Sequence, residues 1–212
     1  MNSRTWSFIS LFVIGLSIGG FFILYEKRRM SPKEIALVAN LSALAGLGRV
    51  PFAAIPSVQP TSFLVIISGY VFGPVTGFAV GALAAVSSNI FLGQGPWTLW
   101  QMICWGLMGV TGGMYKRIGG RGDRFTLSVI GAIWGYLFGW IMNIWHWVTF
   151  VYPLNLKSFI ATYASSFWFD TLHALGNVIF LYYLGPDVIN VLERYKRRLK
   201  VYEIPPESLD KR

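Results

Sequence analysis

Seven long apolar stretches follow one another along this chain, and they constrain its fold more than any other feature. They lie at residues 6–25, 31–48, 60–72, 74–92, 97–115, 125–150 and 158–184. A helix of about 20 residues crosses a bilayer, and fewer are needed where the helix is packed inside protein. Because lipid cannot satisfy backbone amides, such stretches form helices or a closed barrel, and these lack the alternation of barrel strands. The sequence therefore predicts an all-α polytopic membrane protein.

The composition points the same way. Hydrophobic residues make up 54% of the chain and charged residues 13%, whereas a soluble domain carries about 25% charged residues. The single cysteine, Cys104, lies within an apolar stretch, so it can neither pair within the chain nor complete a cysteine-based metal site. We expect no metal site and no intrinsic cofactor.

The basic residues predict how the chain crosses the membrane. Fifteen of the 18 lysines and arginines fall within residues 27–33, 116–124 and 194–212. If seven helices alternate in direction, these clusters share one side, which the positive-inside rule identifies as the cytoplasm. The N-terminus is then outside and the C-terminus cytoplasmic. Anionic lipid or a cytoplasmic partner would meet the net charge of +9, so no nucleic-acid partner is expected.

Three segments are expected along the chain. Residues 1–30 form a transmembrane anchor helix with a basic linker, residues 31–184 a six-helix membrane domain, and residues 185–212 a basic tail. The tail begins with a short amphipathic helix after Gly185 and Pro186 and ends in a mobile segment. The anchor is expected to be retained, because charged residues and not a small-residue cleavage site follow it.

The start of the second apolar stretch is defined by its own residues. Ser31 is an N-cap residue, Pro32 occupies the first helical position, and Glu34 is placed to complete a capping box. We therefore expect a helix to begin at this point.

Polar residues inside a bilayer are costly unless they are matched, so their positions indicate function. Asn143, His146 and Trp147 share one helical face, and Asp170, His173 and Asn177 share another. These two faces are expected to converge on an outward-facing cavity. The alternative is that the polar groups pair with each other or with backbone and only stabilise the bundle.

A loop between two apolar stretches is rich in side chains that stack and hydrogen-bond. Its candidate binding residues are Asn89, Gln94, Trp97, Trp100 and Gln101. The two tryptophans also fit an ordinary aromatic belt at the membrane surface.

Catalytic motifs are not found in the sequence. It contains no P-loop, no Gly-x-Ser-x-Gly and no His-Glu-x-x-His. The chain is therefore not expected to be an enzyme or to hydrolyse ATP itself. His146 and His173 could in principle hold a haem, which leaves a redox membrane protein as one alternative and a ligand-free scaffold as another.

Residues 31–184 resemble the substrate-binding S-components of energy-coupling factor (ECF) vitamin transporters. The segment Ala39-Asn40-Leu41-Ser42-Ala43 is similar to the seam through which these proteins dock on a transmembrane coupling subunit, and residues 49–59 lie where their lid loop would be. The resemblance implies that Ala39 and Ala43 contact that subunit, and that two partner ATPase subunits use ATP to drive delivery of the vitamin.

The stretches 52–61, 93–97 and 169–177 are most similar to members associated with cobalamin uptake. A cobalamin or another corrinoid is therefore the expected substrate. One of the two histidines would be placed to approach its cobalt. The expected substrate contacts are Arg49, Phe52, Gln59, Asn89, Gln94, Trp97, Trp100, Gln101, Asn143, His146, Trp147, Asp170, His173 and Asn177.

Overall fold

The computed structural model describes residues 3–26 and 31–199, and these form helices without any strand. The elements are α1 (Ser3–Glu26), α2 (Pro32–Leu47), the 3-10 helix η1 (Val50–Phe52), α3 (Thr61–Phe72), α4 (Pro74–Leu92), α5 (Trp97–Arg117), α6 (Arg124–Phe150) and α7 (Leu156–Leu199). Each of the seven predicted stretches corresponds to one α-helix. The predicted all-α class is confirmed. The basic linker at residues 27–30 and the expected mobile tail lie outside the described residues.

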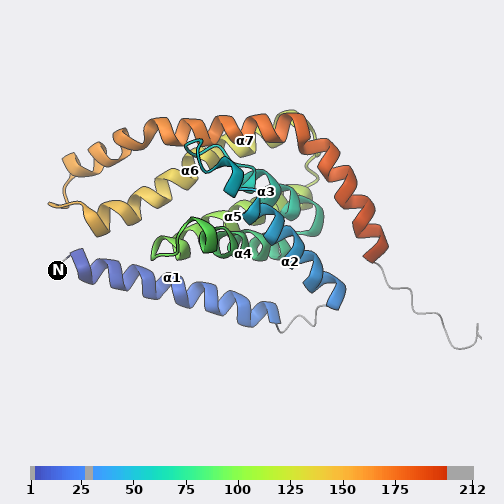
Figure 1. Cartoon of the computed structure of the whole chain (residues 1–212), viewed down its shortest axis with the longest axis horizontal. Coiled ribbons are helices and arrows are strands. Elements are labelled where there is room, and N and C mark those ends of the chain that lie inside the picture. Colours follow the sequence, from blue (N-terminus) through green and yellow to red (C-terminus); the bar gives the residue numbers. More distant parts are fainter. Residues whose placement is uncertain (1–2, 27–30, 200–212) are drawn as a thin grey trace, which may run out of the picture.

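Helices α2 to α7 form one bundle, and α1 runs along its side (Figure 1). The inner side of α1 packs on the bundle, where Phe21 and Phe78 place their ring centroids 4.1 Å apart. Its opposite side presents Phe8 and Phe12 with 72% and 67% of their surface exposed. Exposed aromatic side chains of this kind suit lipid better than water, and the role of α1 as a membrane anchor stays a prediction.

Length and composition make four helical segments suitable for crossing a membrane among the described residues. They are Pro32–Phe52, Pro74–Leu92, Arg124–Phe150 and Leu156–Arg198. Helix α3 is apolar but only 12 residues long, and all of it except Phe72 is buried. A helix enclosed by other helices does not need to match the bilayer thickness by itself.

Glycines bring α3, α4 and α5 into close contact. A side chain on Gly109 would collide with the backbone of Gly77, and one on Gly69 would collide with Gly109. A membrane bundle is held together mainly by packing, and small residues allow the backbones to approach. Gly69, Gly77 and Gly109 therefore mark the crossings of these helices.

The start of α2 is built as its sequence predicts. The Ser31 hydroxyl accepts a hydrogen bond from the Glu34 backbone N–H at 3.3 Å, and the Glu34 carboxylate accepts one from the Ser31 N–H at 2.9 Å. This capping box satisfies two backbone donors that a helix start leaves free.

Helix α7 differs from the prediction of two separate helices. It continues through Gly185 and Pro186 to Leu199. Proline cannot donate the hydrogen bond that would join this turn to the preceding one, which favours a bend without ending the helix. The last part of α7 turns away from the rest in Figure 1. A separate amphipathic helix after Pro186 is therefore a wrong prediction.

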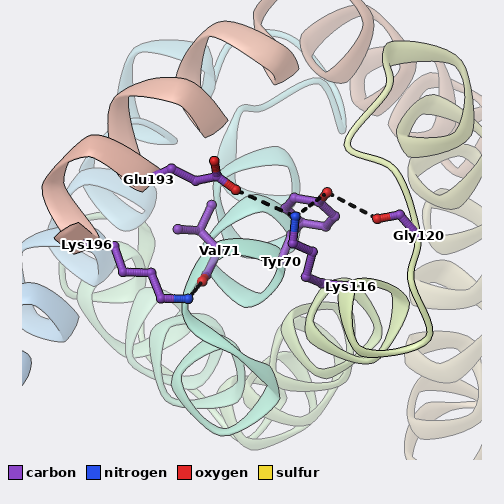
Figure 2. A network of polar contacts seen from close by, with 6 residues as sticks. All are labelled: Tyr70, Val71, Lys116, Gly120, Glu193 and Lys196. Atoms are coloured by element: carbon purple, nitrogen blue, oxygen red, sulfur yellow. Dashed lines mark hydrogen bonds and ion pairs between the residues drawn. The ribbon is translucent and has the colours of Figure 1, made fainter.

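The end of α7 is tied to the bundle end where α3 and α5 finish, which we call the basic end. Lys196 donates to the Val71 carbonyl oxygen, and Lys116 lies 3.6 Å from the Glu193 carboxylate. Lys116 also donates to the Tyr70 hydroxyl at 3.0 Å, and that hydroxyl donates to the Gly120 carbonyl oxygen (Figure 2). Basic segments that are far apart in sequence thus meet at one end, as the alternating topology requires.

Candidate ligand-binding cavity

A cavity of about 470 Å³ lies between the loop at residues 49–59, α6 and α7. Its walls come from that loop, from residues 138–143 of α6 and from residues 166–173 of α7, with Leu92 at the end of α4. The volume falls within the range of small-molecule sites, about 300–1,000 Å³. We call this region of the bundle the cavity end.

Arg49, just after α2, supplies a positive charge to the cavity. Its Nε donates to Gln59 Oε1, and its Nη1 donates to Ser88 Oγ at 3.2 Å and to Asn89 Oδ1 at 3.0 Å. The guanidinium also lies 5.1 Å from the ring centroid of Trp105, within cation–π range. These contacts fix the guanidinium in place, and none of them supplies a negative charge.

Asn89 supports Arg49 from behind. Its Nδ2 donates to Thr98 Oγ1 at 2.9 Å and to Gln101 Oε1 at 2.7 Å, which orients its Oδ1 toward the guanidinium. Gln94 donates to the Val86 carbonyl oxygen and accepts from Thr98. Asn89 of α4 and Thr98 and Gln101 of α5 therefore form a buried polar support for the Arg49 contact, and Gln94 bonds to Thr98 from the exposed loop.

Asp170 of α7 supplies a carboxylate to the opposite side of the lining. Its Oδ2 accepts from Ser166 Oγ at 3.0 Å, and Ser166 Oγ accepts from Asn143 Nδ2 at 2.6 Å. Gly139 of α6 faces this carboxylate, and any side chain there would collide with it. Small residues on α6 thus make room for Asp170 in the cavity wall.

Neither cavity charge has a charged partner. Within residues 3–26 and 31–199 the one ion pair closer than 4.0 Å is Lys116 with Glu193, at the basic end. Arg49 and Asp170 both line the cavity but do not reach each other. Two opposite charges are therefore held apart in one cavity.

His173 forms part of the same wall. Its Nε2 lies 2.8 Å from Ser62 Oγ, and Trp105 Nε1 donates to that hydroxyl at 3.1 Å. Phe138 meets the imidazole edge to face, with ring centroids 5.0 Å apart. Because Arg49 stacks on Trp105, one continuous series of contacts joins Arg49 to His173.

The loop over the cavity is attached to the bundle near both of its ends. Phe52 packs against Phe180 of α7, with ring centroids 5.6 Å apart, and Gln59 accepts the Arg49 hydrogen bond. Between these two points residues 53–56 are exposed. Ala53, Ile55, Pro56 and Ser57 also line the cavity. This arrangement suits a cover whose middle can move while its ends stay in place.

Six of the expected substrate contacts lie together in the cavity lining: Arg49, Phe52, Gln59, Asn143, Asp170 and His173. The others lie elsewhere in the fold. Asn89 and Gln101 are in the support behind Arg49, and Gln94 is at the loop surface. Their direct contact with substrate stays a prediction.

Four further expected contacts lie away from the cavity lining. Trp97 packs against Trp145, with ring centroids 6.3 Å apart, and Trp147 donates to Ser158. Trp100 has a buried indole N–H without a partner among the described residues. Asn177 is fully buried and donates to the Gly131 carbonyl oxygen, two helical turns beyond Asp170.

The two histidines do not face the same space. His173 is 4% exposed in the cavity wall, whereas His146 is exposed on α6 and packs against Phe150. Among the described residues no three metal-binding side chains come together. The expected convergence of both helical faces is therefore limited to Asn143, Asp170 and His173, because α6 and α7 present only about two turns each to the cavity.

Several residues of the cavity lining and of the contacts behind it were not anticipated from the sequence. Ser166 lies four residues before Asp170, a spacing that places both on one helical face, so helical periodicity could have found it. Ser62 and Trp105 carry no such indication, since each lies in an apolar stretch far from His173 in sequence.

The small residues Ala39 and Ala43 are on the outer side of α2. Ala39 is exposed, Ala43 is half-buried, and the neighbouring Leu44 is 58% exposed. The other face of α2 packs on α4, where Ser87 donates to the Ser42 carbonyl oxygen. A flat apolar face thus remains available on α2.

Comparison with known proteins identifies the family. The model of the ECF transporter substrate-specific component matches residues 33–189. A UPF0397 protein from Aliivibrio fischeri is 24% identical over 182 residues, which cover 80% of this chain and 94% of that protein. Another from Vibrio atlanticus is 28% identical over 93 residues, 42% of this chain and 50% of that protein. No solved structure matches this chain significantly. The chain belongs to the family of substrate-specific components of ECF transporters, which are transport subunits and not enzymes.

Proposed function

We propose that this chain captures a small vitamin-class molecule at the outer face of the membrane and delivers it inward with partner subunits. The observation that carries the proposal is the cavity beneath the loop at residues 49–59, where Arg49, Asp170 and His173 line one space inside a largely apolar bundle. Ionisable groups at membrane depth are rare and typically mark a ligand or ion pathway. Membership of the ECF family supports the same role.

The loop would act as the cover of the site. Ligand would enter while the segment from Ala53 to Ser57 is displaced, and its return would exclude water from the charged groups. Water exclusion strengthens each polar contact, because the local dielectric constant falls. Phe52 and Gln59 would hold the ends of the loop throughout.

Energy for uptake would come from partners. The exposed face of α2 around Ala39 and Ala43 would contact a transmembrane coupling subunit, since small residues permit close approach between helices. Two ATPase subunits on the cytoplasmic side would hydrolyse ATP. Reorientation of the whole chain would then release the ligand into the cell.

Cobalamin remains the substrate suggested by resemblance, and the cavity volume favours something smaller. A space of about 470 Å³ suits a ligand of one or two rings. A corrinoid would require the loop at residues 49–59 to open well beyond its present position. A ligand of modest size is therefore the better proposal.

The first experiment is to identify what the protein binds. The full chain is purified in lipid nanodiscs, small molecules that copurify are identified by mass spectrometry, and candidates including cobalamin are titrated by calorimetry. We expect one molecule per chain with submicromolar affinity. If no compound binds, the proposal fails, and a scaffold role becomes the better explanation.

An Asp170→Ala variant separates these two roles. If Asp170 is a ligand contact, the variant loses affinity while its melting temperature without ligand stays the same or rises, because an uncompensated buried charge is removed. If Asp170 only stabilises the bundle, the variant melts at a lower temperature.

A further inference from the structure

The cavity holds two opposite charges in an unusual arrangement. Arg49 and Asp170 both line it, yet neither has an oppositely charged partner within 4.0 Å among the described residues. Burying an ion without a counter-ion is unfavourable by several kcal/mol. A fold that holds both ions apart in one small cavity is suited to a ligand that brings charges of its own.

Each of the two charged groups retains an atom that can still form a hydrogen bond. Arg49 uses Nε and Nη1 in contacts with Gln59, Ser88 and Asn89, whereas its Nη2 has no partner in the part of the chain that the structure describes. Asp170 accepts one hydrogen bond at Oδ2 from Ser166, and within the same residues none is made to Oδ1. That oxygen is not among the atoms sealed from solvent. A guanidinium donor and a carboxylate acceptor thus remain without hydrogen-bond partners on two residues that line the same cavity.

Part of the remaining lining is apolar and suits a compact apolar body, beside polar side chains such as Ser57 and Asn143. Phe138, Met142, Phe169 and Leu92 contribute aromatic and aliphatic surface, and the whole cavity holds about 470 Å³. Guanidinium groups bind carboxylate or phosphate oxygens, and a carboxylate binds a protonated amine. The lining therefore matches a molecule with a charged group of each sign.

We infer that the ligand is a small dipolar molecule, which presents an anionic group to Arg49 and a protonated amine or other cationic nitrogen to Asp170. This inference rests on the proposed function. A purely anionic ligand would place its charge in the same cavity as the Asp170 carboxylate, and a purely cationic one would leave Arg49 unpaired. Each mismatch leaves either the buried Asp170 or the half-buried Arg49 without a counter-charge, so both would be discriminated against.

The test uses ligands that share one body and differ in charge. Thermal stabilisation of the full chain in nanodiscs is measured with L-phenylalanine, 3-phenylpropanoate and 2-phenylethylamine. The same measurement is made with 5-aminopentanoate, pentanoate and pentylamine. Compounds that copurify from cells are identified by mass spectrometry and sorted by the charges they carry at pH 7. We expect the tightest ligand found in either experiment to carry both charges.

Two charge-neutralising variants then assign each charge to its end of the ligand. Arg49→Gln and Asp170→Asn should each lower affinity for the dipolar ligand about 10- to 100-fold. The two variants should differ in the analogue for which they keep their affinity. Asp170→Asn should lose little affinity for the analogue without the amine, and Arg49→Gln little for the analogue without the anionic group. Arg117→Gln and Glu193→Gln, which remove like charges outside the cavity, should leave affinity unchanged.

The outcomes separate the two proposals. If the tightest ligand carries charge of one sign, or none, the dipolar assignment is overturned and the binding function stands. If the variants weaken every analogue equally, the assignment is overturned as well. If no compound of any charge class binds or copurifies, both the assignment and the proposed function fail.

Discussion

The two ends of the helix bundle differ in the partners of their charged side chains. At the basic end Lys116 pairs with Glu193, and Lys196 donates to the Val71 carbonyl oxygen (Figure 2). At the cavity end Arg49 and Asp170 are held by neutral partners. Paired charges at the first end join α7 to the rest of the bundle, and open charges at the second end are available to a ligand.

The difference also appears in burial. The side chains of Lys116 and Glu193 keep 47% and 36% of their surface exposed, whereas Asp170 is 5% exposed. Exposed ion pairs contribute little to stability because water screens them. A buried and unpaired carboxylate opposes folding, so its presence indicates a role other than stability.

The largest effect is expected from Arg49→Lys. The guanidinium is forked and bonds Gln59, Ser88 and Asn89 at once. The single ammonium group of lysine cannot make all these contacts and also bind a ligand. Affinity for the bound compound should fall about 100-fold by calorimetry, since several charge-assisted hydrogen bonds are lost together. Arg117→Lys at the exposed end of α5 is the control. Unchanged affinity in Arg49→Lys would mean that this guanidinium does not face the ligand.

Gly139→Ala should have the next largest effect. The added methyl group meets the Asp170 carboxylate, which must then move away from its present position. We expect affinity to fall about 10-fold, in line with the loss of one hydrogen bond to a charged group. Gly185→Ala is a matched control, because the nearest atom to a methyl group there is 3.8 Å away. Equal affinities for both alanine variants would contradict the placement of Asp170.

Asn89→Ala tests whether the support behind Arg49 matters. The variant removes hydrogen bonds to Arg49, Thr98 and Gln101 and leaves their polar groups buried. The free energy of unfolding should decrease by about 1–3 kcal/mol, and affinity should fall several-fold because the guanidinium is less well oriented. Asn40→Ala, on the exposed face of α2, should change neither quantity. A loss of stability without any change in affinity would limit Asn89 to a structural role.

The smallest effect is expected from Glu193→Gln at the basic end. Removing this partly exposed ion pair should lower stability by about 0–1 kcal/mol. Added salt should lower the melting temperature of the unmodified chain more than that of the variant, because salt screens only the intact pair. Ligand affinity should stay the same. A large loss of affinity would show that the two ends of the bundle are coupled.

Sequence periodicity predicted the helices well and the cavity only in part. The capping box at Ser31 and Glu34 and the positions of all seven helices follow from local pattern. Periodicity also placed Asp170 and His173 on one face, which is correct. It extended that face to Asn177, which instead meets Gly131 at a helix crossing.

The reason lies in the solvent of a membrane protein. Lipid and protein interior are equally apolar, so a transmembrane helix is hydrophobic all round and its sequence does not show which side faces its neighbours. That is why His146, on the same predicted face as Asn143, could be exposed while Asn143 lines the cavity.

The sequence by itself determined the class of protein, the number of helices and the segregation of basic residues, because these depend on hydrophobic length and local hydrogen bonding. Only the tertiary structure decided that Arg49 meets Asn89 across 40 positions, that His173 meets Ser62 across 111, and that Arg49 and Asp170 share a cavity without touching. Contacts between distant segments depend on how the helices pack. Small residues such as Gly109 and Gly139 determine how closely the helices approach, and a local sequence pattern does not show which helices will meet there.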